Sequence, residues 1–137
     1  MNTLNDELAH EAKKAAGLAV KNYYLAFVCL LAALVLNGLA VVFVATDVGS
    51  KGTRAALTAL PGLLILANQV FKFDLRSRWW WLKHHKADAL LRALRDQGAT
   101  VGDVSQSFSR LQLESERDYP AFDITPLRQA VHAPREP

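Results

Sequence analysis

Two long stretches of apolar residues divide the chain, and polar segments with helical patterning precede and follow them. The first stretch, residues 23–46, contains no charged residue. With a rise of about 1.5 Å per residue, a helix of this length reaches roughly 36 Å, slightly more than the roughly 30 Å hydrocarbon layer of a bilayer. The pattern therefore predicts a membrane-spanning helix with some tilt.

The second stretch is shorter and predicts a second span over residues 55–73. Its apolar run ends at Phe71, and we expect the span to continue to Phe73 while the Lys72 ammonium snorkels to the headgroups. Gly49, Ser50 and Gly52 lie in the connecting segment, residues 47–53, and favour a tight turn. Together the two spans predict a transmembrane helical hairpin over residues 23–73.

A cleaved signal peptide is the alternative interpretation of the first stretch, because Lys13, Lys14 and Lys21 precede it. The apolar core of a signal peptide is typically about 7–15 residues long, so this run is too long. A second apolar stretch also follows shortly afterwards. The sequence therefore favours a retained span.

Residues 1–22 predict an amphipathic cytoplasmic helix. Its apolar stripe consists of Leu8, Ala12, Ala15, Ala16, Ala19 and Val20. The stripe is narrow, and three placements remain open for this helix. It can lie on the membrane surface, pack on the C-terminal segment, or extend the first span.

Residues 74–132 predict a cytoplasmic helical domain. Leu90, Leu91 and Leu94 recur at helical spacing, and Gly98 is placed to end that helix. A second helix should begin near Asp103, carry Val104, Phe108 and Leu111 on one face, and end at Tyr119 and Pro120. We expect the pair to form an αα-hairpin. Ile124, Leu127 and Val131 predict one further turn, and residues 133–137 a disordered tail.

The predicted fold class is thus an all-α membrane protein, a two-span hairpin plus a C-terminal αα-hairpin.

The net charge of +3 is less informative than the positions of the charged residues along the chain. Lys51 and Arg54 are the basic residues of the connecting loop and its flank. The tails carry Lys13, Lys14, Lys21, Lys72, Arg76, Arg78, Lys83, Lys86 and Arg92 beside the spans. Because basic residues favour the cytoplasmic side, both termini should be cytoplasmic.

An aromatic and basic run follows the second span and predicts a membrane-interface anchor. Its members are Arg76, Arg78, Trp79, Trp80, Trp81 and Lys83. Indole rings prefer the headgroup region, and the cations can meet anionic lipids. Three consecutive residues on a helix cannot share one face, so we expect at least one tryptophan to pack inward.

Polar or helix-perturbing residues inside the spans are the candidate interface or pore positions: Asn37, Gly38, Pro61, Asn68 and Gln69. Amides in hydrocarbon favour a partner helix or a water-filled lumen. Helix association is the favoured interpretation, because no charged residue lies at depth in the membrane to mark an ion path, Lys72 being expected at the headgroups. Cys29, the single cysteine, is interpreted as a small buried apolar side chain.

Catalytic, metal and cofactor chemistry is not expected. His84 and Asp88 lie one helical turn apart, but zinc requires three or four protein ligands. We find no phosphate-binding glycine loop and no nucleophile with a base at motif spacing. The basic residues gather at the membrane edge, so we expect lipid headgroups and no nucleic acid as their partners.

The order of these features resembles the SLATT family of prokaryotic two-transmembrane effector domains. The resemblance rests on NQVFKF at residues 68–73, on the basic, His-containing segment at residues 81–91, and on the acidic run of residues 111–119 before Pro120. The resemblance extends over nearly the whole chain, and it consists of helical patterns of residue type.

The resemblance implies a self-assembling effector of the cell inner membrane that forms a pore or disrupts the bilayer in anti-phage defence. It transfers no catalytic residue. Because these residues include no sensor domain, it also implies activation by a separate sensor protein or a nucleotide second messenger. Two helices cannot enclose a lumen, so a pore requires a homo-oligomer. Two other classes stay open: a non-conducting membrane anchor or assembly subunit, and a holin-like lysis protein.

Overall fold

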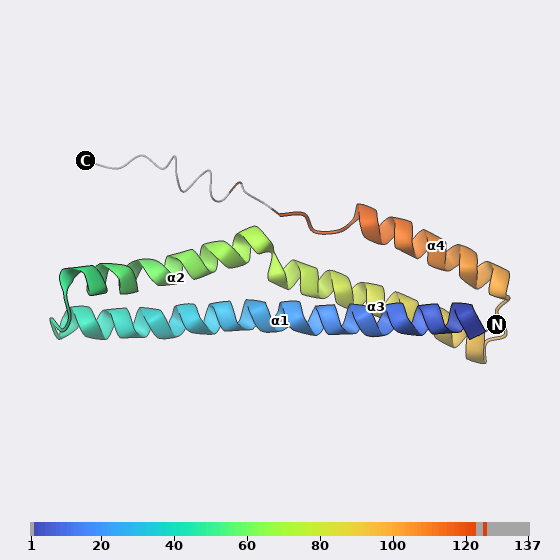
Figure 1. Ribbon diagram of the computed structural model, residues 1–137, viewed down its shortest axis with the longest axis horizontal. Helices are drawn as coiled ribbons and strands as arrows, with labels where there is room; N and C mark the ends of the chain where they lie inside the picture. The colour runs from blue at the N-terminus through green and yellow to red at the C-terminus, as the bar shows by residue number, and fades with distance from the viewer. Residues whose placement is uncertain (1, 123–124, 126–137) are drawn as a thin grey trace. The chain divides into compact units, whose positions relative to one another are not determined.

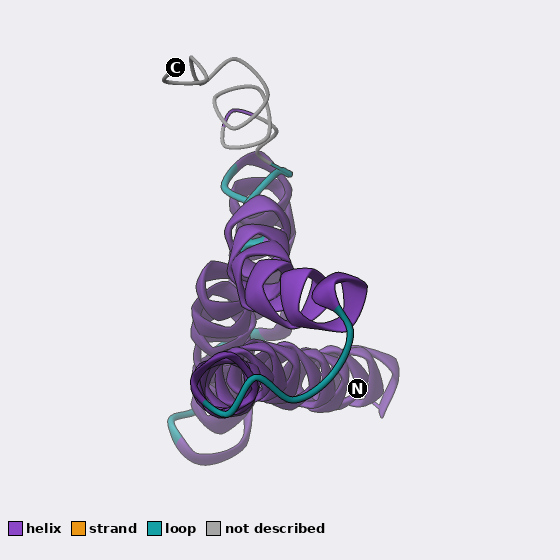
Figure 2. Ribbon diagram, turned by 90° about the vertical axis from the view of Figure 1, so that its left-hand side faces the viewer, coloured by secondary structure: helices purple, strands orange, loops and turns teal. Residues whose placement is uncertain are grey.

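A computed structural model describes residues 2–122 and residue 125 of the chain. These residues form α1 (Asn2–Ala45), α2 (Lys51–Phe71), α3 (Phe73–Asp96) and α4 (Val101–Arg117). The described part of the chain contains no strand (Figures 1 and 2), so the predicted all-helical class is confirmed there. The expected turn at residues 124–131 and the tail at residues 133–137 lie outside the described residues, apart from Thr125.

One helix, α1, joins the N-terminal segment to the first apolar stretch. It is 44 residues long and contains no proline. Gly17 and Gly38 are single helical glycines, which weaken a helix but do not end it. The N-terminal segment therefore extends the first apolar stretch, and its first half also packs on α3 and α4, as described below.

The turn between α1 and α2 is set by its backbone conformations and by a cap. Asp47 and Gly49 have positive φ angles of 54° and 88°, which reverse the chain. The Ser50 hydroxyl accepts a hydrogen bond from the Thr53 amide at 3.2 Å and so caps α2. An ion pair between Arg54 and Asp47 closes the turn. Because of the cap, α2 begins at Lys51, earlier than the predicted start at Ala55.

The chain forms two compact units, described here separately. The hairpin unit contains residues 24–73 with Phe122, and the bundle unit contains residues 2–23 and 74–121. In the hairpin unit, α2 runs antiparallel to the second half of α1 (Figure 1). Its buried side chains are Ala26, Ala33, Ala40, Pro61 and Val70. Alanine at every seventh position of α1 leaves room for α2 to pack closely against it.

The bundle unit is built from three helical segments around one core. Leu8 and Ala12 of α1, Ala87 of α3, and Val104, Phe108 and Leu111 of α4 form its buried cluster. Leu90, Leu91 and Leu94 pack against this cluster. The predicted pairing of the leucines with Phe108 and Leu111 is therefore confirmed, and α1 adds a third helix to the pair.

The helix ends in the bundle unit follow their sequence signals. Gly98 has a φ of 66°, and the Ala99 amide donates to the Ala93 carbonyl at 3.2 Å, so Gly98 ends α3 as predicted. The Thr100 hydroxyl accepts from the Asp103 amide at 3.1 Å, which caps α4. This cap starts α4 at Val101, slightly before the predicted position.

Small side chains on α1 allow α3 to reach its backbone. The Ser77 hydroxyl donates to the Ala19 carbonyl at 2.9 Å, and His84 Nδ1 donates to the Ala12 carbonyl at 3.0 Å. A longer side chain at either alanine would keep α3 from these carbonyl oxygens. Lys83 also forms an ion pair with Glu11 at 3.3 Å. These polar contacts fix the register of α1 against α3.

The hairpin unit exposes most of its apolar surface. Two helical stretches, Thr3–Ala45 and Lys51–Asp96, each contain a window long and apolar enough to cross a membrane. Only 11% of each window is buried inside the chain. Large side chains such as Leu30, Leu34 and Leu63 therefore face outward. A continuous apolar surface of this kind needs a cover other than the chain itself.

Candidate functional site

Asn37 and Gly38 lie on the outer surface of the hairpin unit. Both residues are exposed, and the structure gives the Asn37 amide no hydrogen-bond partner among the described residues. A Cβ placed on Gly38 would meet no atom within 4 Å. Asn37 lies about 4 Å along the helix axis from the middle of the apolar run at residues 23–46. A polar group therefore stands exposed near the centre of the apolar surface.

Asn68 and Gln69 face different sides of α2. Consecutive helical residues are about 100° apart, so the two amides cannot share a face. Asn68 is half-buried, and its Oδ1 is buried without a hydrogen-bond donor among the described residues. Gln69 is exposed. Asn68 thus belongs to the interior of the hairpin, whereas Gln69 is presented outward.

Pro61 and Gly62 also divide between the two sides of α2. Pro61 is buried, and α2 continues through it without a break. Its ring nitrogen carries no hydrogen, so the Leu57 carbonyl loses its usual donor. Gly62 is exposed, with no atom within 4 Å of an added Cβ. The candidate positions therefore split into an inward pair, Pro61 and Asn68, and an outward set, Asn37, Gly38 and Gln69.

The tryptophan run contains an aromatic cluster within the bundle unit. The ring of Tyr119, just after α4, meets Trp79 edge to face at 5.0 Å and Trp80 at 6.3 Å between centroids. Trp79 and Trp80 contact each other at 4.5 Å. Both indoles are half-buried. As predicted, at least one tryptophan packs inward, and the partner is Tyr119 at the end of α4.

Arg76 and Lys83 are engaged by the same cluster. The Arg76 guanidinium lies 5.2 Å from the Tyr119 centroid, and its Nε donates to the Pro120 carbonyl at 3.3 Å. Lys83 Nζ lies 5.5 Å from the Trp80 centroid and is paired with Glu11. Arg76 is buried and Lys83 half-buried. These side chains hold α4 and α1 against α3, and the anchor role of Arg76, Trp79, Trp80 and Lys83 stays a prediction.

Trp81 and Arg78 are the members of the predicted anchor that remain at the surface. Both are exposed, and the Trp81 ring stacks on His85 at 5.7 Å between centroids. Trp81 lies about 200° around the helix from Trp79, the tryptophan nearest to Tyr119, so it points away from that ring. Their role at the membrane interface likewise stays a prediction.

Tyr119→Ala is expected to loosen the C-terminal end of α4. The substitution removes two edge-to-face contacts and the cation–π contact with Arg76, worth together about 1–2 kcal/mol. Amide hydrogen exchange over residues 112–119 should become faster in the purified full chain. Tyr119→Phe keeps the ring and serves as the matched control with near-native exchange. Equal exchange in all three proteins would show that the cluster does not hold α4.

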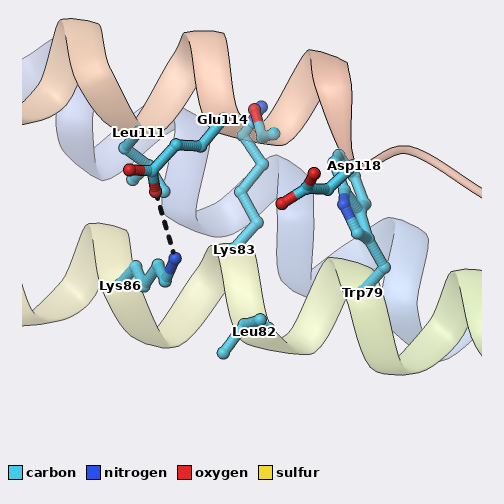
Figure 3. A pocket seen from close by; sticks show the side chains of 8 residues that line it. Trp79, Leu82, Lys83, Lys86, Leu111, Glu114 and Asp118 are labelled. Atoms are coloured by element: carbon cyan, nitrogen blue, oxygen red, sulfur yellow. Dashed lines mark hydrogen bonds and ion pairs between the residues drawn. The ribbon is translucent and has the colours of Figure 1, made fainter.

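A small groove lies between α3 and α4 beside the aromatic cluster (Figure 3). Lys86 Nζ pairs with Glu114 at 3.4 Å across it, and Lys83 and Asp118 flank Trp79 at its other end. Its volume is about 50 Å³. Pockets for small molecules are typically about 300–1,000 Å³, so this groove does not accommodate a nucleotide.

Several charged groups elsewhere in the bundle unit are paired. Hydrogen bonds from Arg95 lower the pKa of the Asp96 carboxyl, and the same contact raises the pKa of Arg95, so both stay charged at neutral pH. Arg92 pairs with Asp88 at 2.9 Å. His84 is used in the contact with Ala12. Within the described residues, no three His, Cys, Asp or Glu side chains are grouped to hold a metal ion.

Comparisons with protein-family models, with curated proteins and with solved structures give no match. Function must therefore be inferred from the geometry of this chain. Sequence reasoning missed Tyr119 as the partner of the tryptophans, and no local signal links residues 79 and 119. It also missed the outward orientation of Asn37, which lies at the edge of the alanine face and whose exposure the alanine spacing does not determine.

Proposed function

We propose that the protein is a self-assembling membrane effector, similar to SLATT proteins, whose copies associate in the bilayer and breach it. The hairpin unit is the membrane-spanning part, and the bundle unit is cytoplasmic. The exposed apolar side chains of α1 and α2 support insertion, because hydrocarbon is the cover that such a surface requires. The excess of Lys and Arg on the two tails supports cytoplasmic termini at the inner membrane.

The observation that carries this proposal is the exposed amide of Asn37 near the middle of the span. An amide without a hydrogen-bond partner is unfavourable in hydrocarbon by several kcal/mol, about 4–8 on water-to-cyclohexane scales. An isolated hairpin would hold Asn37 in that state. Association with another copy satisfies the amide and removes it from lipid. A passive anchor has no need of an outward polar residue at this depth.

Assembly also explains how so small a protein can breach a membrane. Two helices enclose no lumen, but several hairpins arranged about one axis can. Gln69 and Gly62 provide a second polar and small outward region, on α2. With outward contacts on both helices, each hairpin can have two neighbours, so assembly can continue beyond a dimer.

The bundle unit fits a sensor protein better than a nucleotide as its activating partner. A groove of about 620 Å³ between α1 and α4 is lined by Asp6 and Glu7, whose charge opposes a phosphate, and by Glu11, which is already paired with Lys83. Another, of about 500 Å³ between α1 and α3, contains Arg92 and Arg95, which are already paired with Asp88 and Asp96. The charges lining these two grooves therefore favour a cationic protein surface over a phosphate as the trigger.

Inducible expression with a membrane-potential dye tests the effector function. Wild-type protein is expected to depolarise cells and arrest growth as its level rises. The double variant Asn37→Leu/Gln69→Leu should need a several-fold higher protein level for the same depolarisation, because it removes both outward amides. Val42→Leu, an apolar change on the same surface, is the matched control and should behave like wild type.

The absence of depolarisation would contradict this function. Cells that stay polarised and keep growing at every level of wild-type protein, with and without phage infection, would contradict the effector and support a non-conducting anchor. Protein levels in the membrane fraction must match between variants, so that a loss of depolarisation reports assembly and not synthesis.

A further inference from the structure

Asn37 belongs to a regular stripe on the outer surface of α1. The stripe recurs at alternating intervals of three and four residues and consists of Phe27, Leu30, Leu34, Asn37, Val41 and Val44. All of its members are exposed, and Leu34 and Val41 reach 69% and 68%. It is distinct from the buried stripe of Ala26, Ala33 and Ala40, which faces α2. One helix thus carries two seams, and α2 covers only one of them.

The spacing of the outer stripe is that of a left-handed helical seam. Positions repeating every 3.5 residues stay on one line when two helices wrap around each other. Branched apolar side chains occupy the line above and below Asn37, which is the pattern of a seam with a single polar residue. In coiled coils one buried asparagine fixes the register and the number of strands, because shifted registers leave its amide unpaired.

A second copy of this chain is the partner that can pack against this stripe. All copies insert with the same orientation, because the same Lys and Arg distribution directs each of them. The α1 helices of two neighbours are therefore parallel, and residues of equal number lie at equal depth. The asparagine amide carries both a donor and an acceptor, so Asn37 is complementary to Asn37 of another copy.

We propose that α1 pairs in parallel with α1 of a second copy along residues 27–44, with the two Asn37 amides hydrogen-bonded to each other. The pairing rests on the membrane insertion and self-assembly proposed above and specifies their interface. Gly38, beside the seam, presents no side chain to hold the helices apart. Asn37 thus acts as the register residue of the assembly, and α2 remains available on the outside for further contacts.

Cysteine cross-linking in native membranes tests the seam directly. Single cysteines are placed at Leu34 or Val41 on the seam, or at Val35 or Val42 one residue further along, in a Cys29→Ala background. Val35 and Val42 are also exposed, at 52% and 55%, so random collision in the bilayer would cross-link all four sites alike. A disulfide requires Cα atoms within about 7 Å, which a parallel seam provides only at its own positions.

Leu34→Cys and Val41→Cys are expected to give disulfide-linked dimers on oxidation, and Val35→Cys and Val42→Cys to give at least several-fold less. Adding Asn37→Leu to Leu34→Cys should reduce cross-linking roughly threefold to thirtyfold, the range expected for loss of one interhelical hydrogen bond. Asn37→Gln keeps donor and acceptor and should retain most of it. Equal yields at all four sites, or no dimer at any site, would overturn the proposal.

The two proposals fail in different ways. Position-dependent cross-links without depolarisation would support the α1 seam and contradict the effector function. Depolarisation with cross-links absent at Leu34→Cys and Val41→Cys would support the effector and contradict this seam. Labelling of Asn37→Cys by a membrane-impermeant thiol reagent in the assembled protein would place residue 37 in a water-filled lumen, and would likewise overturn the pairing.

Discussion

Phe108→Ala is expected to lower the stability of the bundle unit by about 3–5 kcal/mol, enough to unfold much of it. Phe108 is 6% exposed and lies in the cluster that joins α1, α3 and α4. Its removal leaves a cavity between Leu8, Val104 and Leu111, the other large or branched side chains that are buried in this cluster. The alanines of the core are too small to fill this space. The loss of stability should therefore lie at the upper end of the range for Phe→Ala substitutions.

Circular dichroism and proteolysis of the purified full chain in detergent check this expectation. Phe108→Ala should lose helix at a lower temperature and become sensitive to protease between α3 and α4. Leu113→Ala is the matched control, because Leu113 lies on the same helix but is 69% exposed. A Phe108→Ala protein that melts like wild type would show that the bundle core is organised differently from the structure described here.

The bundle unit could be predicted from sequence where the signal was local. The helical spacing of Leu90, Leu94, Phe108 and Leu111 indicated two helices with facing apolar stripes, and Gly98 indicated where the first of them ends. The stripe at Leu8 and Ala12 showed that the N-terminal segment needs a cover. It did not show which of the three placements this segment takes, because a narrow apolar stripe fits lipid and protein alike.

The tryptophan run shows why one local pattern can have two structural outcomes. Indoles beside basic residues are stable at a headgroup layer, and equally stable when their rings meet another aromatic ring and a cation. Trp79 and Trp80 take the second outcome because Tyr119 returns to them from the end of α4. Such a contact depends on the lengths of two helices and one turn, which residue types at 79–81 do not determine.

In the hairpin unit, composition alone does not give the orientation of the polar residues. Asn37, Asn68 and Gln69 were recognised as polar interruptions, but their orientation depends on which face of each helix is buried. The alanines at 26, 33 and 40 mark that face on α1, because a repeat of seven residues keeps one side of a helix in contact with its partner. Asn37 lies only about 40° around the helix from Ala33, at the edge of this face, so its exposure comes from the structure and not from the alanine repeat.

Ala33→Leu is expected to force α1 and α2 apart. Ala33 is 3% exposed, in the middle of the buried stripe, and a leucine there adds three heavy atoms where the neighbouring helix leaves no room. Overpacking of this kind costs about 1–3 kcal/mol. Amide hydrogen exchange over residues 57–68 of α2, measured in detergent micelles, should therefore become roughly fivefold to a hundredfold faster.

Val35→Leu separates this steric effect from added apolar volume in general. Val35 is exposed, so the larger side chain extends into the surrounding detergent and should leave exchange in α2 unchanged. Unchanged exchange in Ala33→Leu as well would mean that the alanine stripe is not where the helices touch. The exposed position of Asn37 would then lose its basis as well, because it depends on which side of α1 is covered by α2.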